Sequence, residues 1–299
     1  MPVKMLEDLM KEEKLSVCSH GEDLDGLTSA SLLIAIRPEG LEVYFSAPYE
    51  IKNFKGSYDV VLDLPPPIGG ARVLIDHHIS NTSLLDRVKT PILRPEYPST
   101  ARLLYEILSE LEPGVRRYSE LIDLTDATDS GRMDLESALF TSAARKLFKE
   151  RKRKLLEVCR DLLRAPPASS RDLVDLPSLR SEVNFLIREY GSLIERILSL
   201  SEGEAILLNL RNYPSYLVPL IQLASQSYKL LGTLTKGSDG LLRLSLRSRP
   251  DSPLTALQLA GALGGGGHEH AAGALVSPSI VPEVVDRIRK FLPLDIVDL

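Results

Sequence analysis

The 299-residue chain is poor in cysteine, with only Cys18 and Cys159, and these two do not form a CxxC arrangement. A disulfide framework and a zinc–thiolate site are therefore disfavoured, and both thiols are expected in the apolar core. Apolar runs fall short of the ~20 residues that cross a bilayer, and the charged segment 1–14 lacks the apolar core of a signal peptide. We expect a cytoplasmic protein with no membrane association.

Basic charge is scarce in the first part of the chain. Residues 1–130 contain 22 Asp and Glu against 13 Lys and Arg, whereas the whole chain has a net charge of −5. Such an acidic excess is costly in a compact lobe unless cations bind some of the carboxylates, and it disfavours duplex binding through a broad basic face. A basic run at 145–154 could bind nucleic acid, although a solvated helix face is the simpler interpretation.

Hydrophobic patterns divide the chain into three parts. Alternating strands and helices in residues 1–131 predict an α/β domain with a doubly wound parallel sheet. Residues 132–199 have helical patterns, one of them running from 134 to 163, and are interpreted as a helical bridge. Residues 200–299 predict a smaller α/β domain, with a strand hairpin between 229 and 246.

A predicted buried strand, Val73-Leu74-Ile75, ends in Asp76, His77 and His78. Polar residues at the carboxyl end of such a strand lie where open α/β sheets bind ligands. Two solubilising histidines at a strand end would explain His77 and His78 taken alone. Three other segments, however, end with the same residue types.

The first of these segments places His20, Asp23 and Asp25 within six residues at a predicted strand-to-helix turn, and Gly26 permits a tight exit. An Asp-rich turn that caps the helix is the alternative. In the second segment, Asp63 ends a strand just before three prolines, where a solvated turn carboxylate is the alternative. These positions predict metal ligands gathered at one edge of the sheet.

The third segment is an acidic cluster at 121–131. Asp126 and Asp129 are three residues apart, so they share a face if the segment is helical, and Asp123 could join them one turn earlier. Clustered acids on a helix repel one another without a counter-ion. A solvated acidic turn is the alternative, and the spacing does not decide whether Asp126 or Asp129 is the inward ligand.

Four consecutive glycines, Gly264 to Gly267, precede His268 and the small residues 271–273. Each glycine costs roughly 0.5–1 kcal/mol of extra chain entropy relative to alanine, which suggests that the backbone closely approaches a ligand. We expect a helix to start here, because exposed amides at a helix N-terminus form an anion site. A flexible loop is the alternative.

Taken together, these motifs resemble the signature of the DHH phosphoesterase superfamily. The matching residues are His20-x-x-Asp23-x-Asp25-Gly26, Asp63, Asp76-His77-His78, and Asp126 or Asp129 before Ser130-Gly131. Some members place one more residue between the His and the first Asp, so Glu22 also lies within reach of His20. The segment 265–273 resembles the GGGHxxAAG signature of the domain that follows many DHH domains, and 245–248 resembles its upstream strand.

The resemblance implies an active site in a cleft between two lobes, with two metal ions. Oxygen and imidazole ligands without thiolate suit Mn²⁺, with Mg²⁺ or Co²⁺ as substitutes. One ion would be held by His20, Asp23 and Asp63, and the other by Asp25, Asp63, His77 and Asp126 or Asp129. His78 would face the phosphate, and Asp76 would orient a histidine. Substrate would be bound by Arg247, Ser248, Gly265, Gly266, Gly267 and His268.

The implied activity is manganese-dependent hydrolysis of short single-stranded oligonucleotides or linear dinucleotides by two-metal activation of a bridging water, as in nano-RNases and single-strand exonucleases. An inorganic pyrophosphatase or exopolyphosphatase would use the same metals. A non-hydrolytic nucleotide sensor or a replication scaffold is an alternative from another class. A homodimer is one candidate assembly.

Overall fold

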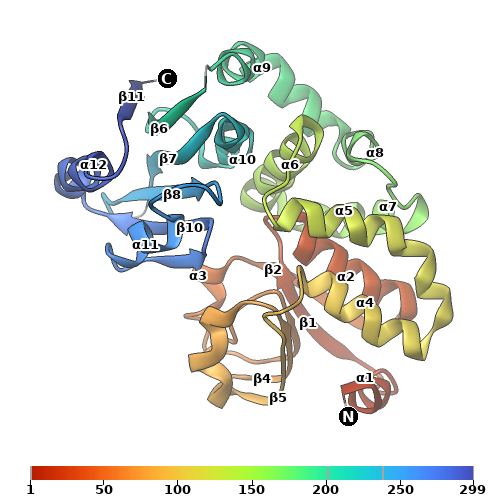
Figure 1. Ribbon diagram of the computed structural model, residues 1–299. Coiled ribbons are helices and arrows are strands. Elements are labelled where there is room, and N and C mark those ends of the chain that lie inside the picture. The colour runs from red at the N-terminus through yellow and green to blue at the C-terminus, as the bar shows by residue number, and fades with distance from the viewer. Residues whose placement is uncertain (1, 201, 238, 299) are drawn as a thin grey trace. The chain divides into compact units, whose positions relative to one another are not determined.

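The structure is a computed structural model that describes residues 2–200, 202–237 and 239–298 (Figure 1). The chain forms two compact units, Met1–Asn184 and Phe185–Leu299. Among the described helices, none is long and apolar enough to cross a membrane.

The first unit is built on a parallel sheet with the strand order β2-β1-β3-β4-β5, which confirms the predicted doubly wound α/β fold. Its strands are β1 (Leu15–His20), β2 (Leu41–Ser46), β3 (Tyr58–Leu62), β4 (Ala71–Asp76) and β5 (Val88–Leu93). The sequence does not predict β5, because Pro91 interrupts its pattern; an edge strand tolerates this proline. The chain reverses direction across the sheet between β1 and β3, so their carboxyl ends form a topological switch point.

Successive residues of each strand point to opposite faces of this sheet, and the two faces pack into cores of different size. Val17 points into the larger core, which is formed with α1 (Pro2–Leu9), α2 (Leu24–Ile36) and α4 (Thr100–Leu111) and closed by η2 (Pro113–Tyr118) and α5 (Ser119–Asp129). Cys18 points into a smaller core formed with α3 (Pro48–Ile51) and the 3-10 segment η1 (Ile79–Arg87). Cys18 and Cys159 are both buried, as expected of apolar core residues.

The predicted helix from 134 to 163 is interrupted in the structure. It divides into α6 (Leu135–Arg151), the 3-10 turn η3 (Lys152–Lys154) and α7 (Leu155–Arg164), followed by α8 (Ser170–Val174) and α9 (Arg180–Leu198). The break falls at Arg151, whose backbone is not helical (φ −151°, ψ 55°). It allows Arg151 to pair with Glu182 and Lys152 with Glu50. α7 packs against α2, so α6 and α7 extend the first unit, and the boundary with the second unit falls within α9.

The second unit contains a mixed sheet with the order β11-β6-β7-β8-β10-β9. Its strands are β6 (Gly203–Asn209), β7 (Tyr228–Lys236), β8 (Leu242–Ser248), β9 (Gly266–His268), β10 (Ala271–Val276) and β11 (Leu294–Asp298). The antiparallel pairing of β7 with β8 confirms the predicted hairpin. α11 (Ala256–Gly261) and α12 (Val281–Arg289) contribute to the core of this unit, with η6 (Pro278–Ile280) before α12.

Residues 217–228 have a sequence pattern that predicts a helix, but the structure forms a series of short turns there instead. These are η4 (Ser215–Leu217), α10 (Val218–Ile221) and η5 (Gln222–Gln226). Tyr228 already belongs to β7, where it pairs with Gly203 of β6 and is buried. The end of this segment therefore forms a strand rather than a helix, because Tyr228 pairs with β6 and is buried.

The expectation that the glycine run starts a helix is wrong, because the run enters the β9–β10 hairpin. A Cβ on Gly265 would lie 2.1 Å from the carbonyl oxygen of Gly273. Gly267 has a φ of 141°, and a Cβ there would lie 2.5 Å from the carbonyl oxygen of Ala271. Close packing of two strands thus explains these two glycines, whereas a Cβ on Gly266 would meet no atom within 4 Å.

Candidate metal centre

The segments that follow β1, β3 and β4 bring carboxylates and imidazoles together at the carboxyl edge of the parallel sheet. His20 ends β1, and its Nδ1 lies 2.7 Å from Oδ2 of Asp23 and 3.3 Å from Oδ2 of Asp63. Glu22, the other neighbour of His20, is more distant, with 3.8 Å between His20 Nε2 and Glu22 Oε2. Burial lowers the pKa of His20, but the negative charges of Asp23 and its neighbours outweigh burial and raise that pKa well above its usual value.

Asp23 also serves the fold, because its Oδ1 accepts a hydrogen bond of 3.1 Å from the backbone N–H of Gly26 and caps α2. The capping and ligand interpretations of this segment are therefore compatible. Burial would raise the pKa of Asp23, but His20 and the capping hydrogen bond lower it to about 2. Asp23 is thus held as a carboxylate beside His20.

Asp63 is central to the cluster. It follows β3 in the left-handed region, with a φ of 55°, and only 3% of its surface is exposed. This conformation costs an aspartate on the order of 1–2 kcal/mol, a strain that is common at functional sites. The strained turn directs the buried carboxylate towards His20 on one side and His77 on the other.

His77 faces three acidic side chains. Its Nε2 lies 3.3 Å from Oδ2 of Asp129, 3.7 Å from Oδ2 of Asp25 and 3.8 Å from Oδ1 of Asp63. Its Nδ1 lies 3.2 Å from the carbonyl oxygen of Tyr97, which suits the tautomer that donates from Nδ1 and directs Nε2 to the carboxylates.

Two of these carboxylates have raised pKa values. Burial raises the pKa of Asp25 well above its usual value, and the charges of Asp63 and Asp129 add to the effect. Burial also raises the pKa of Asp129, to about 7; His77 opposes this shift and Asp63 adds to it. Like charges gathered out of water favour a cation among them.

The helix α5 separates the two candidates of the fourth motif. Asp129, at the end of α5, lies beside His77. Asp126, one turn earlier, accepts hydrogen bonds of 2.6 Å from Ser99 Oγ and 2.7 Å from Arg102 Nε. Asp123 accepts from the same guanidinium. The acids of the fourth motif thus divide between an arginine and the imidazole cluster.

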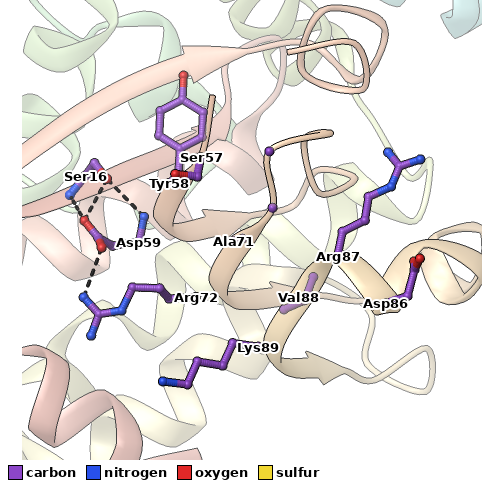
Figure 2. A pocket seen from close by; sticks show the side chains of 12 residues that line it. Ser16, Ser57, Tyr58, Asp59, Ala71, Arg72, Asp86, Arg87, Val88 and Lys89 are labelled. Atoms are coloured by element: carbon purple, nitrogen blue, oxygen red, sulfur yellow. Dashed lines mark hydrogen bonds and ion pairs between the residues drawn. The ribbon is translucent and has the colours of Figure 1, made fainter. Parts of the chain in front are cut away.

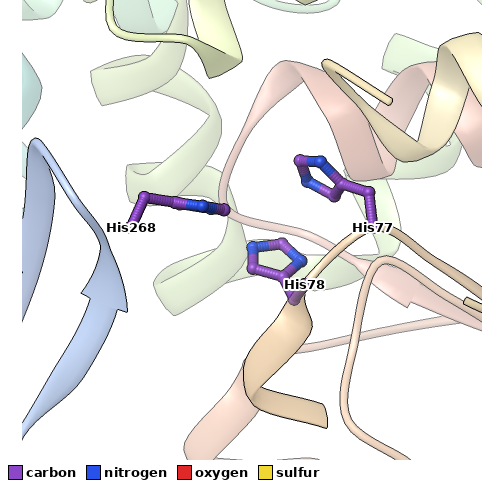
Figure 3. Close-up of side chains that lie close together, drawn as sticks. All are labelled: His77, His78 and His268. Atoms are coloured by element: carbon purple, nitrogen blue, oxygen red, sulfur yellow. The ribbon is translucent and has the colours of Figure 1, made fainter. Parts of the chain in front are cut away.

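Asp76 organises the segment after β4, in which the rings of His77 and His78 approach edge to face (Figure 3). Its Oδ1 accepts from the backbone N–H of His77 and His78, at 2.9 and 3.1 Å, and lies 2.9 Å from His78 Nδ1. Burial lowers the pKa of His78, but Asp76 and Asp63 outweigh it and raise the pKa to about 9. Asp76 thus fixes the orientation of the His78 ring and favours its protonated form.

The sequence does not reveal the residues that hold these side chains in place. The backbone N–H groups of Thr100 and Ala101, at the start of α4, donate to the two oxygens of Asp25 at 2.8 and 2.7 Å. Thr100 Oγ1 donates to Asp63 Oδ1 at 3.2 Å, and Asn81 Nδ2 donates to Asp76 at 2.5 Å. Ser99 and Thr100, which are typical N-cap residues, are the signal that could have indicated an anion-binding helix end.

The donors of the cluster fit divalent cations. Three groups of side chains in the first unit each offer one ligand atom per residue within 4.8 Å of one another, and Asp63 belongs to all three. The groups are His20, Asp23 and Asp63; Asp25, Asp63 and His77; and Asp63, Asp76 and His78. His20 Nε2 is buried without a hydrogen bond in the part of the chain that the structure describes. A cation would satisfy that atom and relieve the repulsion between the carboxylates.

A hollow of about 390 Å³ lies at the opposite, amino-terminal edge of the sheet (Figure 2). Here Asp59 accepts from the backbone N–H and Oγ of Ser16 at 2.8 and 2.7 Å, and from Arg72 at 3.1 Å. Arg72 also pairs with Glu12. This network ties β1, β3 and β4 together and pairs its acids with an arginine, whereas Asp25 and Asp129 at the carboxyl edge lie among other carboxylates.

The residues expected in the second lobe lie on neighbouring strands of the second unit. Arg247 of β8 is in register with Ala271 of β10, which is in register with His268 of β9. Arg247 and His268 thus occupy one row across three strands, and Gly266 and Gly267 precede His268. Ser248 is buried, and its Oγ accepts from the backbone N–H of Ala256 at 3.0 Å, so it links β8 to α11.

No protein-family model and no curated protein matches the sequence, whereas solved structures match its fold. A pGpG-specific phosphodiesterase from Vibrio cholerae aligns over 93% of this chain and 98% of its own, with a TM-score of 0.61 and 19% identity. RecJ from Thermus thermophilus, in complex with Mn²⁺, aligns over 99% of this chain with a TM-score of 0.61 and 17% identity. The chain spans about half of RecJ, 55% of its length.

A DHH domain from a protein described as a member of a ribosomal-protein family aligns over 97% of this chain and 89% of its own. Its TM-score is 0.63 at 16% identity. The likeness in each case extends through both units, from the parallel sheet to the mixed sheet. The chain therefore shares the fold of these proteins, in agreement with the α/β architecture that the sequence predicts.

Proposed function

We propose that this chain is a metal-dependent phosphodiesterase that hydrolyses short oligonucleotides or linear dinucleotides. The observation that carries the proposal is the position of Asp63, a strained and buried carboxylate that is common to three potential ligand groups at the switch point of the sheet. A ligand shared in this way suits two cations held side by side.

The proposed ligands of one ion are His20, Asp23 and Asp63, and those of the other are Asp25, Asp63, His77 and Asp129. We assign Asp129 rather than Asp126 because Asp126 is engaged by Ser99 and Arg102. Mn²⁺ is the proposed ion, with Mg²⁺ or Co²⁺ as substitutes, because the donors are carboxylate oxygens and imidazole nitrogens. RecJ structures with Mn²⁺ and with Mg²⁺ support this choice.

When bound, the two ions supply an activated water and neutralise charge on the phosphate. The chain supplies the remaining functions. Thr100 and Ala101 fix the direction of the Asp25 carboxylate. His78 can donate a hydrogen bond to a phosphate oxygen, because Asp76 holds its ring in place through Nδ1.

We propose that the second unit binds the substrate end. Arg247 would form a bidentate pair with a phosphate, and His268 with the backbone of Gly265, Gly266 and Gly267 would bind the adjoining nucleotide. Ser248 would hold β8 in place beneath Arg247. Functionally, we divide the chain into a phosphoesterase domain at 1–131, a helical bridge at 132–199 and a substrate-binding domain at 200–299. The pGpG specificity of the phosphodiesterase with this fold supports a substrate of this size.

Asp63→Asn tests the proposal, because asparagine also accepts the left-handed backbone and so removes charge with little change in fold. We expect turnover of a linear dinucleotide with Mn²⁺ to fall by at least about 100-fold, since both ions lose a ligand. Asp86→Asn, the same change on an exposed carboxylate at the other edge of the sheet, is the matched control and should leave turnover unchanged. A wild-type rate in Asp63→Asn with normal Mn²⁺ binding would contradict the two-metal assignment.

A further inference from the structure

A groove with a volume of about 480 Å³ lies beside β2, the edge strand of the parallel sheet, and the proposed metal ligands do not line it. Its walls include Tyr44 of β2, Tyr58 of β3, and Lys152 and Arg153 of η3. All of these residues belong to the first unit. The groove thus combines aromatic rings with cations.

Tyr44 and Tyr58 line the groove, and Phe54 lies next to Tyr58 as the third ring of a row. The centroids of Tyr44 and Tyr58 are 5.6 Å apart, and those of Tyr58 and Phe54 are 5.3 Å apart with an interplanar angle of 27°. Tyr44 and Phe54 are 46% and 43% exposed. Tyr44, Tyr58 and Phe54 thus form a row of partly exposed rings in contact. Such rings provide a platform for stacking bases, because every base has a π-face.

The cations of the groove come from the basic run at 145–154. Much of that run is neutralised within the fold, because Lys146 and Arg151 pair with Glu182, and Lys152 pairs with Glu50. Arg153 differs from them: it is exposed, lines the groove and makes no ion pair with any residue that the structure describes. Its charge is therefore available to an anion that enters the groove.

The groove also lies next to the proposed metal centre. Ser46, which lines it, is in register with His20 across the β1–β2 ladder, and its carbonyl oxygen accepts the backbone N–H of Gly21 at 3.1 Å. Adjacent strands are about 4.8 Å apart, so the groove begins one strand away from a proposed metal ligand. An extended polymer could contact both the groove and the proposed metal centre.

We propose that this groove binds single-stranded nucleic acid, with bases stacked on Tyr44 and Tyr58 and a phosphate held by Arg153. The groove would hold nucleotides of the same substrate strand, next to the nucleotide that is hydrolysed. The choice of substrate therefore rests on the proposed function. Binding in the groove itself does not require hydrolysis.

The test measures the affinity of the full-length protein, with Mn²⁺, for a dye-labelled phosphorothioate dT10, which resists hydrolysis and keeps its charges. Fluorescence anisotropy should show binding about 10-fold weaker for Tyr44→Ala, because base–aromatic stacking is lost. Tyr44→Phe keeps the ring and should bind as wild type does. Phe291→Ala, at an exposed ring in the second unit, is the matched control.

Arg153→Ala should weaken dT10 binding and reduce the salt dependence of log K by about 0.7, the value for one phosphate contact on a single strand. Arg171→Ala, which removes an exposed arginine on α8, is its control. Wild-type affinity in both Tyr44→Ala and Arg153→Ala would overturn the proposal. So would a change from dimer to monomer in Tyr44→Ala with unchanged dT10 binding, because the edge strand would then serve a protein partner.

The two proposals fail in distinguishable ways. If wild-type protein hydrolyses no oligonucleotide but its dT10 binding depends on Tyr44, the proposed function is wrong and the groove stands. If dinucleotides are hydrolysed and dT10 binding depends on neither Tyr44 nor Arg153, the groove is refuted and the proposed function stands.

Discussion

At the scale of single residues, Asp126 and Asp129 show how neighbouring acids take different roles. Asp129→Asn should weaken Mn²⁺ binding and reduce turnover by about 10- to 100-fold or more, because its carboxylate lies beside His77. Asp126→Asn should retain Mn²⁺ and lower the free energy of unfolding by about 1–3 kcal/mol, because Arg102 loses a charged partner. Isothermal titration with Mn²⁺ and urea unfolding of both variants would test this; the reverse pattern would move the ligand to Asp126.

The residue types of the cluster were predictable from sequence because His20, Asp63 and His77 each follow an apolar strand, and the ends of parallel strands share one edge of a sheet. The choice between Asp126 and Asp129 was not. It depends on Ser99 and Arg102, which belong to α4 and reach Asp126 only when α4 and α5 are packed together. The same holds for Thr100 and Asp25, which lie 75 residues apart in the chain and meet through tertiary structure.

At the scale of elements, the glycine run shows that one of its glycines is required by strand packing and another is not. Gly265→Ala should lower the free energy of unfolding by about 1–3 kcal/mol, because its Cβ would collide with the backbone of β10. Gly266→Ala, one residue away, meets open space and is the matched control. Thermal unfolding of the two variants would decide, and equal stability would show that the hairpin does not require Gly265.

The link between α6 and α9 should make stability depend on pH. Glu182 is buried, and its Oε2 lies 2.9 Å from Nζ of Lys146. Burial would raise the pKa of Glu182, but Lys146 and Arg151 outweigh burial and lower that pKa. The contribution of Glu182 is therefore present above its ordinary pKa of 4.5 and is lost as the pH falls through the lower pKa of the folded state. Urea unfolding from pH 7 to pH 3 should show a shallower acid decline in Glu182→Gln than in wild type. Parallel curves would contradict the assignment.

Elements with a simple periodicity, such as β4 and the β7–β8 hairpin, were predictable from local pattern. β5 was not predictable, because Pro91 interrupts its strand pattern. The prediction of a helix after residue 263 was wrong. Glycine and proline occur in turns, at strand edges and at helix ends alike. Which of these conformations forms depends on the strand that the segment pairs with. For Gly265 that partner is β10.

At the scale of the whole molecule, Arg247 and His268 should set the preferred length of the substrate. Arg247→Ala should reduce cleavage of di- to pentanucleotides by about 10- to 100-fold, because a charge-assisted contact contributes about 1.5–3 kcal/mol. Pyrophosphate, which has no nucleotide for the second unit to bind, should be a poor substrate and indifferent to this change. Initial rates for both substrates would test the prediction; an equal loss on pyrophosphate would argue against a role in substrate length.

The central claim is that the chain uses divalent metal to cleave short nucleic acids. The most direct measurement is an activity screen of metal-stripped protein, with Mn²⁺ or Mg²⁺ added back, on linear dinucleotides, oligonucleotides of up to ten residues, cyclic dinucleotides and pyrophosphate. We predict no turnover without metal, higher rates with Mn²⁺ than with Mg²⁺, and the highest rates on substrates of about two to five nucleotides. Full turnover by the metal-stripped protein, or a preference for pyrophosphate over every oligonucleotide, would contradict the account.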